Sequence, residues 1–384
     1  MSGYLSILRS LPVVVLFVLA MAGSRAGAEL VDLSQDLAGV REEFRLPAVG
    51  AAVILDGKLH ALGVVGVRKD GGKVRAEPND AFHLGSCTKA MTGSLIGLLV
   101  EQGKLQWDTP LVEYFPEMKD TMHPDYRGVT LVHLLSHRAG VPSMTAGFAP
   151  VEGRELGNIR KMKSPAEQRR RVAEIVLTQP PIHKPGEKYE YSNAGFTIAG
   201  VIAERAMGED YESLLQRMLF GPLQMRTAGF GSMGTLGKTD ALWGHRRKGD
   251  KIIPVQPGPQ ADNPPFLTPG GRVHCSMADW AKYVQCILAA ARGEAALLPA
   301  SCVRQLKEPF FGGGYALGWS LHDRDWGGRV LTHSGTNTMH YAIVWVAPEK
   351  HFAVLVAANR GGDGAAEGLD KLCGVMIRKF LAGQ

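Results

Sequence analysis

The sequence has little that would point to a metal centre or to a disulfide framework. Its five cysteines form no C-x-x-C pair, and their odd number leaves at least one thiol unpaired within the chain. A disulfide scaffold is not expected in a chain of 384 residues, although Cys286 and Cys302 flank a short helix-loop segment and could pair in an oxidising compartment. His133 and His137 are spaced as on one helix face, but Leu134 stands where the H-E-x-x-H zinc motif requires glutamate. We therefore expect no metal site and no organic cofactor.

The sequence also lacks a strong excess of either charge. Apolar residues make up 45% and charged residues 21%, which is typical of a folded soluble protein. The formal net charge is +6, and it falls to +4 without the first 28 residues, which contain Arg9, Arg25 and no acidic residue. Basic residues gather in the stretches 160–171 and 245–251, but no aromatic residues interleave with them as nucleic-acid binding would favour. We expect no nucleic-acid partner, and at most a weak contact of these stretches with an anionic cell envelope.

One hydrophobic run stands out, at the beginning of the chain. The apolar residues from Leu11 to Met21 follow Arg9 and precede Ala26-Gly27-Ala28, a small-residue cleavage pattern. The run is shorter than the roughly 20 residues of a membrane-spanning helix, so we interpret residues 1–28 as a secretory signal peptide rather than an uncleaved anchor. No other stretch of the sequence could span a bilayer. The mature chain is expected to be periplasmic or secreted, without a transmembrane span.

Apolar patterns predict strands near both ends of the remaining chain and helices between them. Residues 49–67 are predicted to form two strands around the turn signal Asp56-Gly57, and 329–336 and 340–360 to form three more. Helix-period segments flank these strands at 33–44 and 365–381 and fill the middle at 131–137, 169–177, 194–207, 210–220 and 277–292. We predict one α+β domain over residues 29–384. Its antiparallel sheet, flanked by helices, comes from about 29–85 and 310–384, with a mostly helical lobe between and a site in the cleft.

The segment H-L-G-S-C-T-K, residues 83–89, places a lysine one helical turn after a serine. Apolar residues at 91, 95, 98 and 99 predict a mostly buried helix directly after a predicted strand at 81–85. Burial and the positive end of the helix dipole would both lower the pKa of Lys89. Such a lysine can remove the proton from the Ser86 hydroxyl and make it nucleophilic. The tetrad S-x-x-K also occurs by chance, so further elements are needed.

A second segment, Tyr191-Ser192-Asn193, precedes the predicted helix at 194–207. A tyrosine can relay protons, and an asparagine can donate to an acyl or amide oxygen. Taken alone, the segment is better explained by a packed tyrosine and a helix-capping asparagine.

A third segment, His333 to Thr336, ends a predicted strand. Gly335 would let a substrate approach the backbone, and the amide of Thr336 could form an oxyanion hole with that of Ser86. Taken alone, His333 could be an ordinary strand histidine.

In this chain order, S-x-x-K, Y-x-N and H-x-G resemble the three active-site motifs of the serine beta-lactamase and penicillin-binding-protein superfamily, in its class C beta-lactamase-like and esterase branch. The supporting stretches cover essentially all of the mature chain: LVHLLSHRAGVPS (131–143), PGEKYEYSNAGF (185–196), FGPLQMRTAGFG (220–231), TPGGRVHCSMADWAKY (268–283) and YALGWS (315–320). The resemblance implies a beta-lactamase/transpeptidase-like fold and a catalytic domain over residues 29–384.

The resemblance also implies roles for single residues. Ser86 would be the acylated nucleophile, Lys89 its activating base and Tyr191 the proton relay in acylation and deacylation. Asn193 would bind the acyl-side amide of the substrate or position Lys89. The remaining substrate-binding residues would be His333, Gly335 and Thr336, with the backbone N–H groups of Ser86 and Thr336 holding the oxyanion.

One position departs from the superfamily pattern. His333 stands where lactamases and wall carboxypeptidases usually have the lysine of K-T-G, which helps bind the substrate carboxylate. A histidine is neutral much of the time near pH 7, so an esterase or D-amino-acid peptidase is favoured over an efficient beta-lactamase. No G-x-S-x-G pentapeptide follows a predicted strand, which argues against the rival serine-hydrolase elbow. We predict a secreted serine hydrolase acting on small-molecule or peptide esters or amides. The alternative is a catalytically inactive module that recognises cell-wall peptide or a protein partner.

Overall fold

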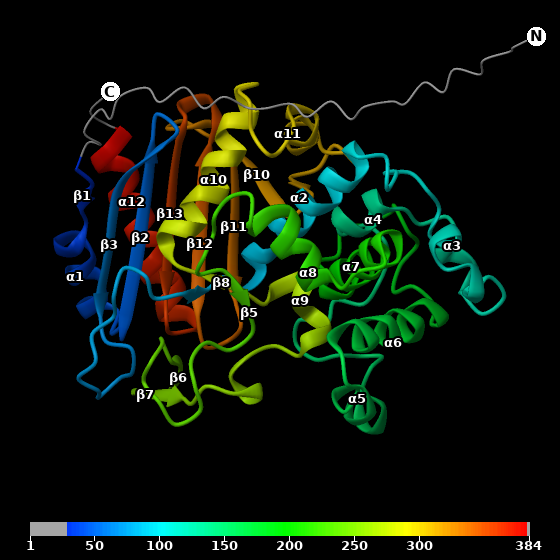
Figure 1. Ribbon diagram of the computed structural model, residues 1–384, viewed down its shortest axis with the longest axis horizontal. Helices are drawn as coiled ribbons and strands as arrows, with labels where there is room; N and C mark the ends of the chain where they lie inside the picture. The colour runs from blue at the N-terminus through cyan, green and yellow to red at the C-terminus, as the bar shows by residue number, and fades with distance from the viewer. Residues whose placement is uncertain (1–28, 382–384) are drawn as a thin grey trace, which may run out of the picture.

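Strands from both ends of the chain share one eight-stranded sheet in the computed structural model, which describes residues 29–381 (Figure 1). The strand order is β1-β3-β2-β13-β12-β11-β10-β9. The strands are β1 (Val31–Asp32), β2 (Ala48–Leu55), β3 (Lys58–Gly66), β9 (Tyr315–Ala316), β10 (Trp319–Arg324), β11 (Gly328–Thr336), β12 (Tyr341–Ala347) and β13 (Phe352–Ala358). Neighbours are antiparallel, except that β1 runs parallel to β3. The α+β fold prediction is confirmed, whereas the predicted signal peptide lies outside the described residues.

The turn between β2 and β3 follows the sequence signal. Asp56 and Gly57 both have positive φ, +51° and +73°, and a two-residue hairpin turn of this type needs positive φ at both central positions. Leu55 pairs with Lys58 across the turn. The β2–β3 hairpin is therefore set by local sequence.

Helices cover both faces of the sheet. α1 (Ser34–Glu43) and α12 (Asp363–Leu381) pack on one face, and α10 (Met277–Ala291) packs on the other. Side chains alternate along a strand, so Val49 and Val53 of β2 join the core under α1 and α12, while Ala48 and Ala52 join the core under α10. Because both faces are buried, β2 is apolar at every position except Gly50.

The segment between the terminal strands is mostly helical. Its helices are α2 (Thr88–Glu101), α3 (Leu111–Tyr114), α4 (Leu131–Leu135), α5 (Gly153–Arg160), α6 (Pro165–Thr178), α7 (Asn193–Met207), α8 (Tyr211–Leu215), α9 (Thr268–Gly271) and α11 (Ala300–Lys307). The single helix expected over 210–220 is α8 followed by a π-helical turn, Gln216–Phe220. Among the described residues, none of the helices has the length and apolarity needed to cross a membrane.

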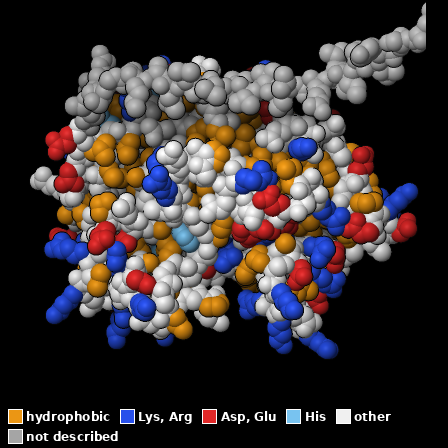
Figure 2. Space-filling model, in the orientation of Figure 1, with side chains coloured by type: hydrophobic (Ala, Val, Ile, Leu, Met, Phe, Trp, Pro, Cys, Tyr) orange, Lys and Arg blue, Asp and Glu red, His pale blue; other side chains and the backbone are white. Residues whose placement is uncertain are grey.

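Two small sheets were not predicted as units. One has the order β4-β8-β5 and joins β4 (Phe82–His83), β8 (Val273–Cys275) and β5 (Gly229–Phe230); the other pairs β6 (Gly244–Lys248) with β7 (Lys251–Val255). Strands of two or three residues carry too little pattern to be found in a sequence. Figure 2 shows Lys and Arg side chains gathered on the lower part of this face, over β6, β7, α5 and α6.

The cysteines are all free, so the considered pairing of Cys286 with Cys302 is wrong. Cys286 is buried on α10, whereas the Sγ of Cys302 packs closely against Gly97 of α2. Each thiol is thus part of a separate packing contact.

Candidate active site

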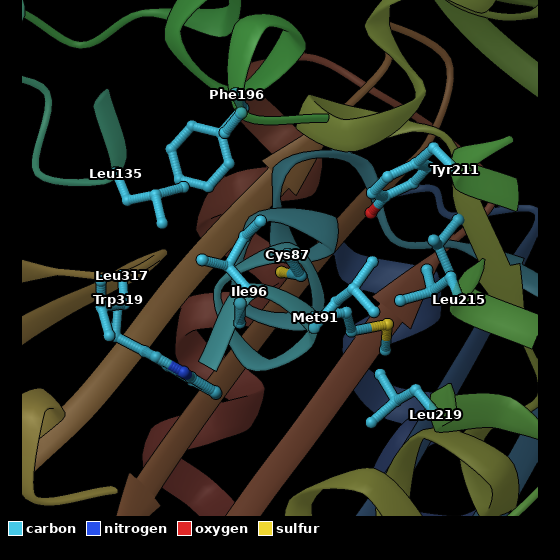
Figure 3. Close-up of a cluster of buried hydrophobic side chains, with 14 of the residues drawn as sticks. Cys87, Met91, Ile96, Leu135, Phe196, Tyr211, Leu215, Leu219, Leu317 and Trp319 are labelled. Carbon is cyan, nitrogen blue, oxygen red and sulfur yellow. The ribbon is translucent and has the colours of Figure 1, made fainter. Parts of the chain in front are cut away.

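Ser86 lies at the point where the chain passes from β4 into α2. It belongs to a single 3-10 turn, Gly85–Cys87, and Gly85 has φ +51°, a conformation that glycine adopts without strain. The helix that follows is buried on nearly all sides. Figure 3 shows the apolar side chains around it, among them Leu135, Phe196, Tyr211 and Trp319. This packing fixes the start of α2, with Ser86 at its partly exposed edge.

Lys89 points inward from the first turn of α2 and is fully buried. Its Nζ lies 3.3 Å from Ser86 Oγ, 2.7 Å from Asn193 Oδ1 and 2.6 Å from the carbonyl oxygen of Gly270. The last two oxygens can only accept hydrogen bonds. A neutral amine donates its two N–H groups to them and keeps its lone pair for the Ser86 hydroxyl, while a protonated amine donates to all three. Both protonation states of Lys89 are therefore satisfied.

The environment of Lys89 also brings its proton affinity close to neutrality. Burial lowers the pKa of Lys89 from 10.5 to about 7, because an ammonium ion loses its hydration in the protein interior. Near pH 7 a large fraction of the amine is thus neutral and able to accept a proton from Ser86.

Asn193 is the first residue of α7, but it does not cap that helix. The capping residue is Ser192, whose Oγ accepts the N–H of Gly195 at 3.1 Å. Asn193 Nδ2 donates to the carbonyl of Met144 at 2.9 Å, which turns Oδ1 toward Lys89. In this structure, Asn193 therefore contacts Lys89 through the oxygen of its amide.

Tyr191 neighbours both the lysine and the serine. Lys89 Nζ is 4.8 Å from the centre of its ring. Burial raises the pKa of Tyr191 above its usual value of 10, and a side-chain hydrogen bond with Ser86 offsets part of the rise. The phenol is accordingly protonated near neutral pH, so it can donate or pass on a proton but is not a standing phenolate base.

Strand β11 passes directly beside the serine. A Cβ on Gly335 would lie 2.5 Å from the backbone N of Ser86, and a Cβ on Gly85 would lie 2.2 Å from the backbone N of Thr336. Both distances are too short for any other residue, so two glycines allow the two backbones to approach. The amides of Ser86 and Thr336 are thereby brought together, as an oxyanion hole requires.

His333 is buried at the other end of the same motif. Burial and the nearby Lys89 charge lower the pKa of His333 to about 3. Nδ1 lies 2.6 Å from the carbonyl oxygen of Ser334, and Nε2 lies 3.4 Å from the hydroxyl of Tyr315. His333 is therefore neutral, with the proton on Nδ1, and provides no positive charge for a substrate carboxylate.

A buried carboxylate that the sequence analysis missed lies beneath this backbone site. Asp262 Oδ1 is 2.8 Å from His83 Nε2 and 3.2 Å from Asn337 Nδ2, and its Oδ2 is 3.2 Å from Arg272 Nε. Burial raises the pKa of Asp262, but the contacts with His83, Arg272 and Asn337 outweigh it and bring the pKa to about 2. Asp262 is thus a fixed negative charge.

This carboxylate connects both halves of the paired backbone. His83 Nδ1 accepts the N–H of Gly85, next to the nucleophile, at 3.1 Å, and Asn337 directly follows Thr336. Through these two neighbours, Asp262 holds the segments that carry both amides. No local pattern could reveal this, because Asp262 lies in a loop far along the chain from His83.

Two other missed contacts involve the lysine and the tyrosine. The Gly270 carbonyl carries no side-chain signal, although T-P-G-G was among the supporting stretches. His137 Nδ1 accepts the N–H of Ser192 at 3.0 Å, and its ring centre lies 4.4 Å from that of Tyr191. α4 ends before His137, which has φ +57°, so His133 and His137 do not share a helix face. Among residues 29–381, no cluster of three or more His, Cys, Asp or Glu side chains could hold a metal ion.

Comparisons with known proteins include a family model that covers most of the chain. A family model described as Beta-lactamase matches residues 33–372. Protein flp of Staphylococcus aureus is 23% identical over 321 residues, which are 83% of this chain and 60% of that protein. Unguisins hydrolase ungD of Aspergillus violaceofuscus is 25% identical over 363 residues, 85% of this chain and 61% of that protein. The chain therefore spans about 60% of the length of these curated relatives.

Solved structures of similar fold cover most of the chain. The octameric penicillin-binding protein homologue from Pyrococcus abyssi superposes with a TM-score of 0.71 at 25% identity, covering 90% of this chain and 78% of its own. D-amino acid amidase from Ochrobactrum anthropi SV3, solved with L-phenylalanine amide, gives a TM-score of 0.68 at 22% identity, covering 90% and 98%. At this level of identity, the similarity to the D-amino acid amidase shows a shared fold only.

Proposed function

This chain belongs to the beta-lactamase family of serine hydrolases, and we propose that it cleaves an ester or amide bond through a covalent acyl intermediate on Ser86. The observation that carries the proposal is the fully buried amine of Lys89, 3.3 Å from the Ser86 hydroxyl. Burial that lowers the pKa of this amine to about 7 is unfavourable for the free energy of folding. Such a perturbed group next to a hydroxyl is typical of an active site.

Acylation follows from the contacts around Ser86. Neutral Lys89 takes the hydroxyl proton as Oγ bonds to the substrate carbonyl carbon, and the carbonyl oxygen becomes an oxyanion between the two backbone amides. Tyr191 then donates its proton to the leaving alcohol or amine as the bond to the carbonyl carbon breaks. Lys89 returns the proton to Tyr191. The products are acyl-Ser86 and the free leaving group, with both side chains in their starting states.

Deacylation reverses this order with water as the attacking group. Tyr191 takes a proton from the water as it passes its own to Lys89, and the water oxygen bonds to the acyl carbon. The ester bond to Oγ then breaks, and the proton on Lys89 returns to Ser86. The raised pKa of Tyr191 suits this role, because the phenolate exists only in passing.

The substrate class is narrowed by the neutral His333. A substrate that depends on a lysine at this position to hold its carboxylate, such as a penicillin, binds less well to a neutral imidazole. We therefore favour esters and amides, including amides of D-amino acids, over beta-lactams. The name of the D-amino acid amidase of similar fold supports the amide part of this proposal.

The proposed place of action is outside the cytoplasm, after removal of residues 1–28. The support is the short apolar run with its small-residue cleavage pattern. N-terminal sequencing of the protein from its native host should give Glu29 as the first residue, and a start at Met1 would contradict the proposal.

Covalent labelling tests the function directly. Intact-mass analysis after exposure to a fluorophosphonate should show one adduct on the wild-type protein and none on Ser86→Ala. A penicillin should leave the mass unchanged or label more slowly. If the folded wild-type protein takes neither label and hydrolyses no ester or amide, the chain is an inactive binding module instead.

A further inference from the structure

A cavity of about 340 Å³ borders the Asp262 network that supports the candidate catalytic centre. We call it the basic pocket; its lining includes Phe148, Arg160, Arg246, Asp262, Asn337 and Thr338. Asp262 and Asn337 are the residues that hold the paired backbone of Ser86 and Thr336. The pocket therefore shares two lining residues with the network that holds the paired backbone.

The charge of this pocket is positive. Arg160 ends α5 and Arg246 lies on β6, both are exposed, and within residues 29–381 neither guanidinium has a carboxylate at ion-pair distance. The acid in the lining, Asp262, is 2% exposed and already engaged by Arg272 and His83. Figure 2 shows the molecular surface hollowed between β6–β7 and α5, with Lys and Arg side chains on both sides. Two uncommitted cations thus face the pocket, and no uncommitted anion does.

A second cavity lies on the Tyr191 side of the candidate active site. It measures about 250 Å³, and its lining includes the rings of Tyr189, Phe311 and Tyr315 together with Arg138, so we call it the aromatic pocket. The His137 ring, which packs on Tyr191, also lies 5.6 Å from the ring of Tyr189 and 4.6 Å from that of Tyr315. The aromatic pocket is therefore on the side of Tyr191, the residue that protonates the leaving group.

The basic pocket lies beyond the other end of the same strand segment. His333 contacts Tyr315 of the aromatic pocket, whereas Asn337 and Thr338, just past the oxyanion amide of Thr336, border the basic pocket. A carbonyl group held between the two amides would direct its leaving group toward the aromatic pocket. Its acyl chain would then extend into the basic pocket.

We propose that the basic pocket binds an anionic group on the acyl chain of the substrate, through Arg160 and Arg246, so that the preferred substrates are esters or amides of dicarboxylic-type acids. This assignment rests on the proposed acyl-Ser86 chemistry. A guanidinium binds a carboxylate with paired, charge-assisted hydrogen bonds, and the exposed position of both side chains lets an acyl chain of several carbons reach them. The aromatic pocket would accept the leaving group among its aromatic rings.

The test compares two chromogenic esters that share a leaving group and a five-carbon acyl chain. One is mono-p-nitrophenyl glutarate, which ends in a carboxylate, and the other is p-nitrophenyl pentanoate. After subtraction of spontaneous hydrolysis, the wild-type protein should show the higher kcat/KM for the glutarate ester. The preference should fall as sodium chloride is raised, since the charges are exposed to screening.

Substitutions of the two arginines test whether they cause the preference for the glutarate ester. Arg246→Gln and Arg160→Gln should each lower the glutarate-to-pentanoate ratio of kcat/KM about tenfold, the order expected for losing a hydrogen bond to a charged group. Arg247→Gln is the matched control, because Arg247 is the next residue on β6, lies outside the lining and is 3.8 Å from Asp250. It should leave the ratio at the wild-type value.

The outcomes distinguish a failure of the basic-pocket proposal from a failure of the acyl-Ser86 proposal. Hydrolysis of both esters without preference, or a preference that neither arginine variant changes, overturns the basic pocket and leaves the acyl-Ser86 proposal standing. No hydrolysis and no fluorophosphonate adduct contradicts the chemistry itself. Calorimetry with Ser86→Ala measures ester binding without turnover. Weaker binding of the glutarate ester after the additional change Arg246→Gln supports the basic pocket. Equal binding of both esters by Ser86→Ala refutes it.

Discussion

Replacing Lys89 by methionine tests the central assumption, that its amine releases its proton on folding. In the unfolded chain Lys89 has a pKa near 10.5, and in the folded protein burial lowers this pKa to about 7. Between these values the unfolded state binds more protons than the folded state. The free energy of unfolding of the wild-type protein should therefore rise with pH in this window. The contribution is least favourable below pH 7 and disappears above about pH 10.5.

The magnitude follows from one proton. At about 1.36 kcal/mol per pH unit, with the folded group half-protonated at pH 7, the wild-type protein should gain about 2 kcal/mol between pH 7 and 9 relative to Lys89→Met. Methionine also leaves Asn193 Oδ1 and the Gly270 carbonyl without their donor, which costs about 1–3 kcal/mol for each group. That cost does not depend on pH. It shifts the stability curve of the variant without changing its slope.

Urea unfolding followed by tryptophan fluorescence at pH 7, 8 and 9 measures both curves. Lys89→Gln serves as a control, because it lacks the titrating proton but can still donate hydrogen bonds. Both variants should show the same loss of slope relative to wild type, together with a fall in kcat of at least about a hundredfold. Parallel curves for wild type and Lys89→Met would show that the lysine keeps its proton in the folded state. In that case the role of Lys89 as base would be wrong.

Three further substitutions probe the other groups. Tyr191→Phe should slow turnover by about a hundredfold and let acyl-Ser86 accumulate in intact-mass spectra; an unchanged rate would remove Tyr191 from the proton path. Asp262→Asn should lower kcat by about tenfold or more with little change in KM, since a misplaced oxyanion donor weakens the transition state more than the ground state. A change confined to KM would contradict the positioning role. Gly335→Ala should abolish activity and lower Tm, because its Cβ would lie 2.0 Å from the Leu84 carbonyl oxygen; a fully active Gly335→Ala protein would refute the close backbone approach.

The parts of the fold that could be predicted are those specified by short-range pattern. Asp56-Gly57 fixes the β2–β3 hairpin, and the apolar run from residue 91 predicts the buried helix α2. The small sheet β4-β8-β5 could not be found, because strands this short exist only through pairing between distant segments. The π-helical turn Gln216–Phe220 likewise continues the helical period of α8 and has no separate signal.

The candidate site shows the same division. The structure brings Ser86, Lys89, Tyr191 and Asn193 into contact, although they come from two segments about a hundred residues apart. The motifs could indicate these residues because each carries its chemistry in a side chain. The Gly270 carbonyl could not be indicated, since any residue has one. Asp262 could not either, since its importance comes only from partners that folding brings to it.

The neutral state of His333 and the position of the two arginines in the basic pocket both bear on the pKa of Lys89. In the proposed mechanism Lys89 must lose its proton to act as the base, and a second cation nearby would lower the pKa of this lysine further and compete for the same anions. Lys89 and His333 already interact electrostatically: burial and the positive charge of Lys89 together lower the pKa of His333 to about 3. An uncharged residue at 333 leaves burial as the main control on Lys89, so the lysine stays near neutrality rather than being driven well below it. The proposed anionic substrate would then be recognised by cations that do not lower the pKa of Lys89. Arg160 and Arg246, exposed at the rim of a separate pocket, meet that condition.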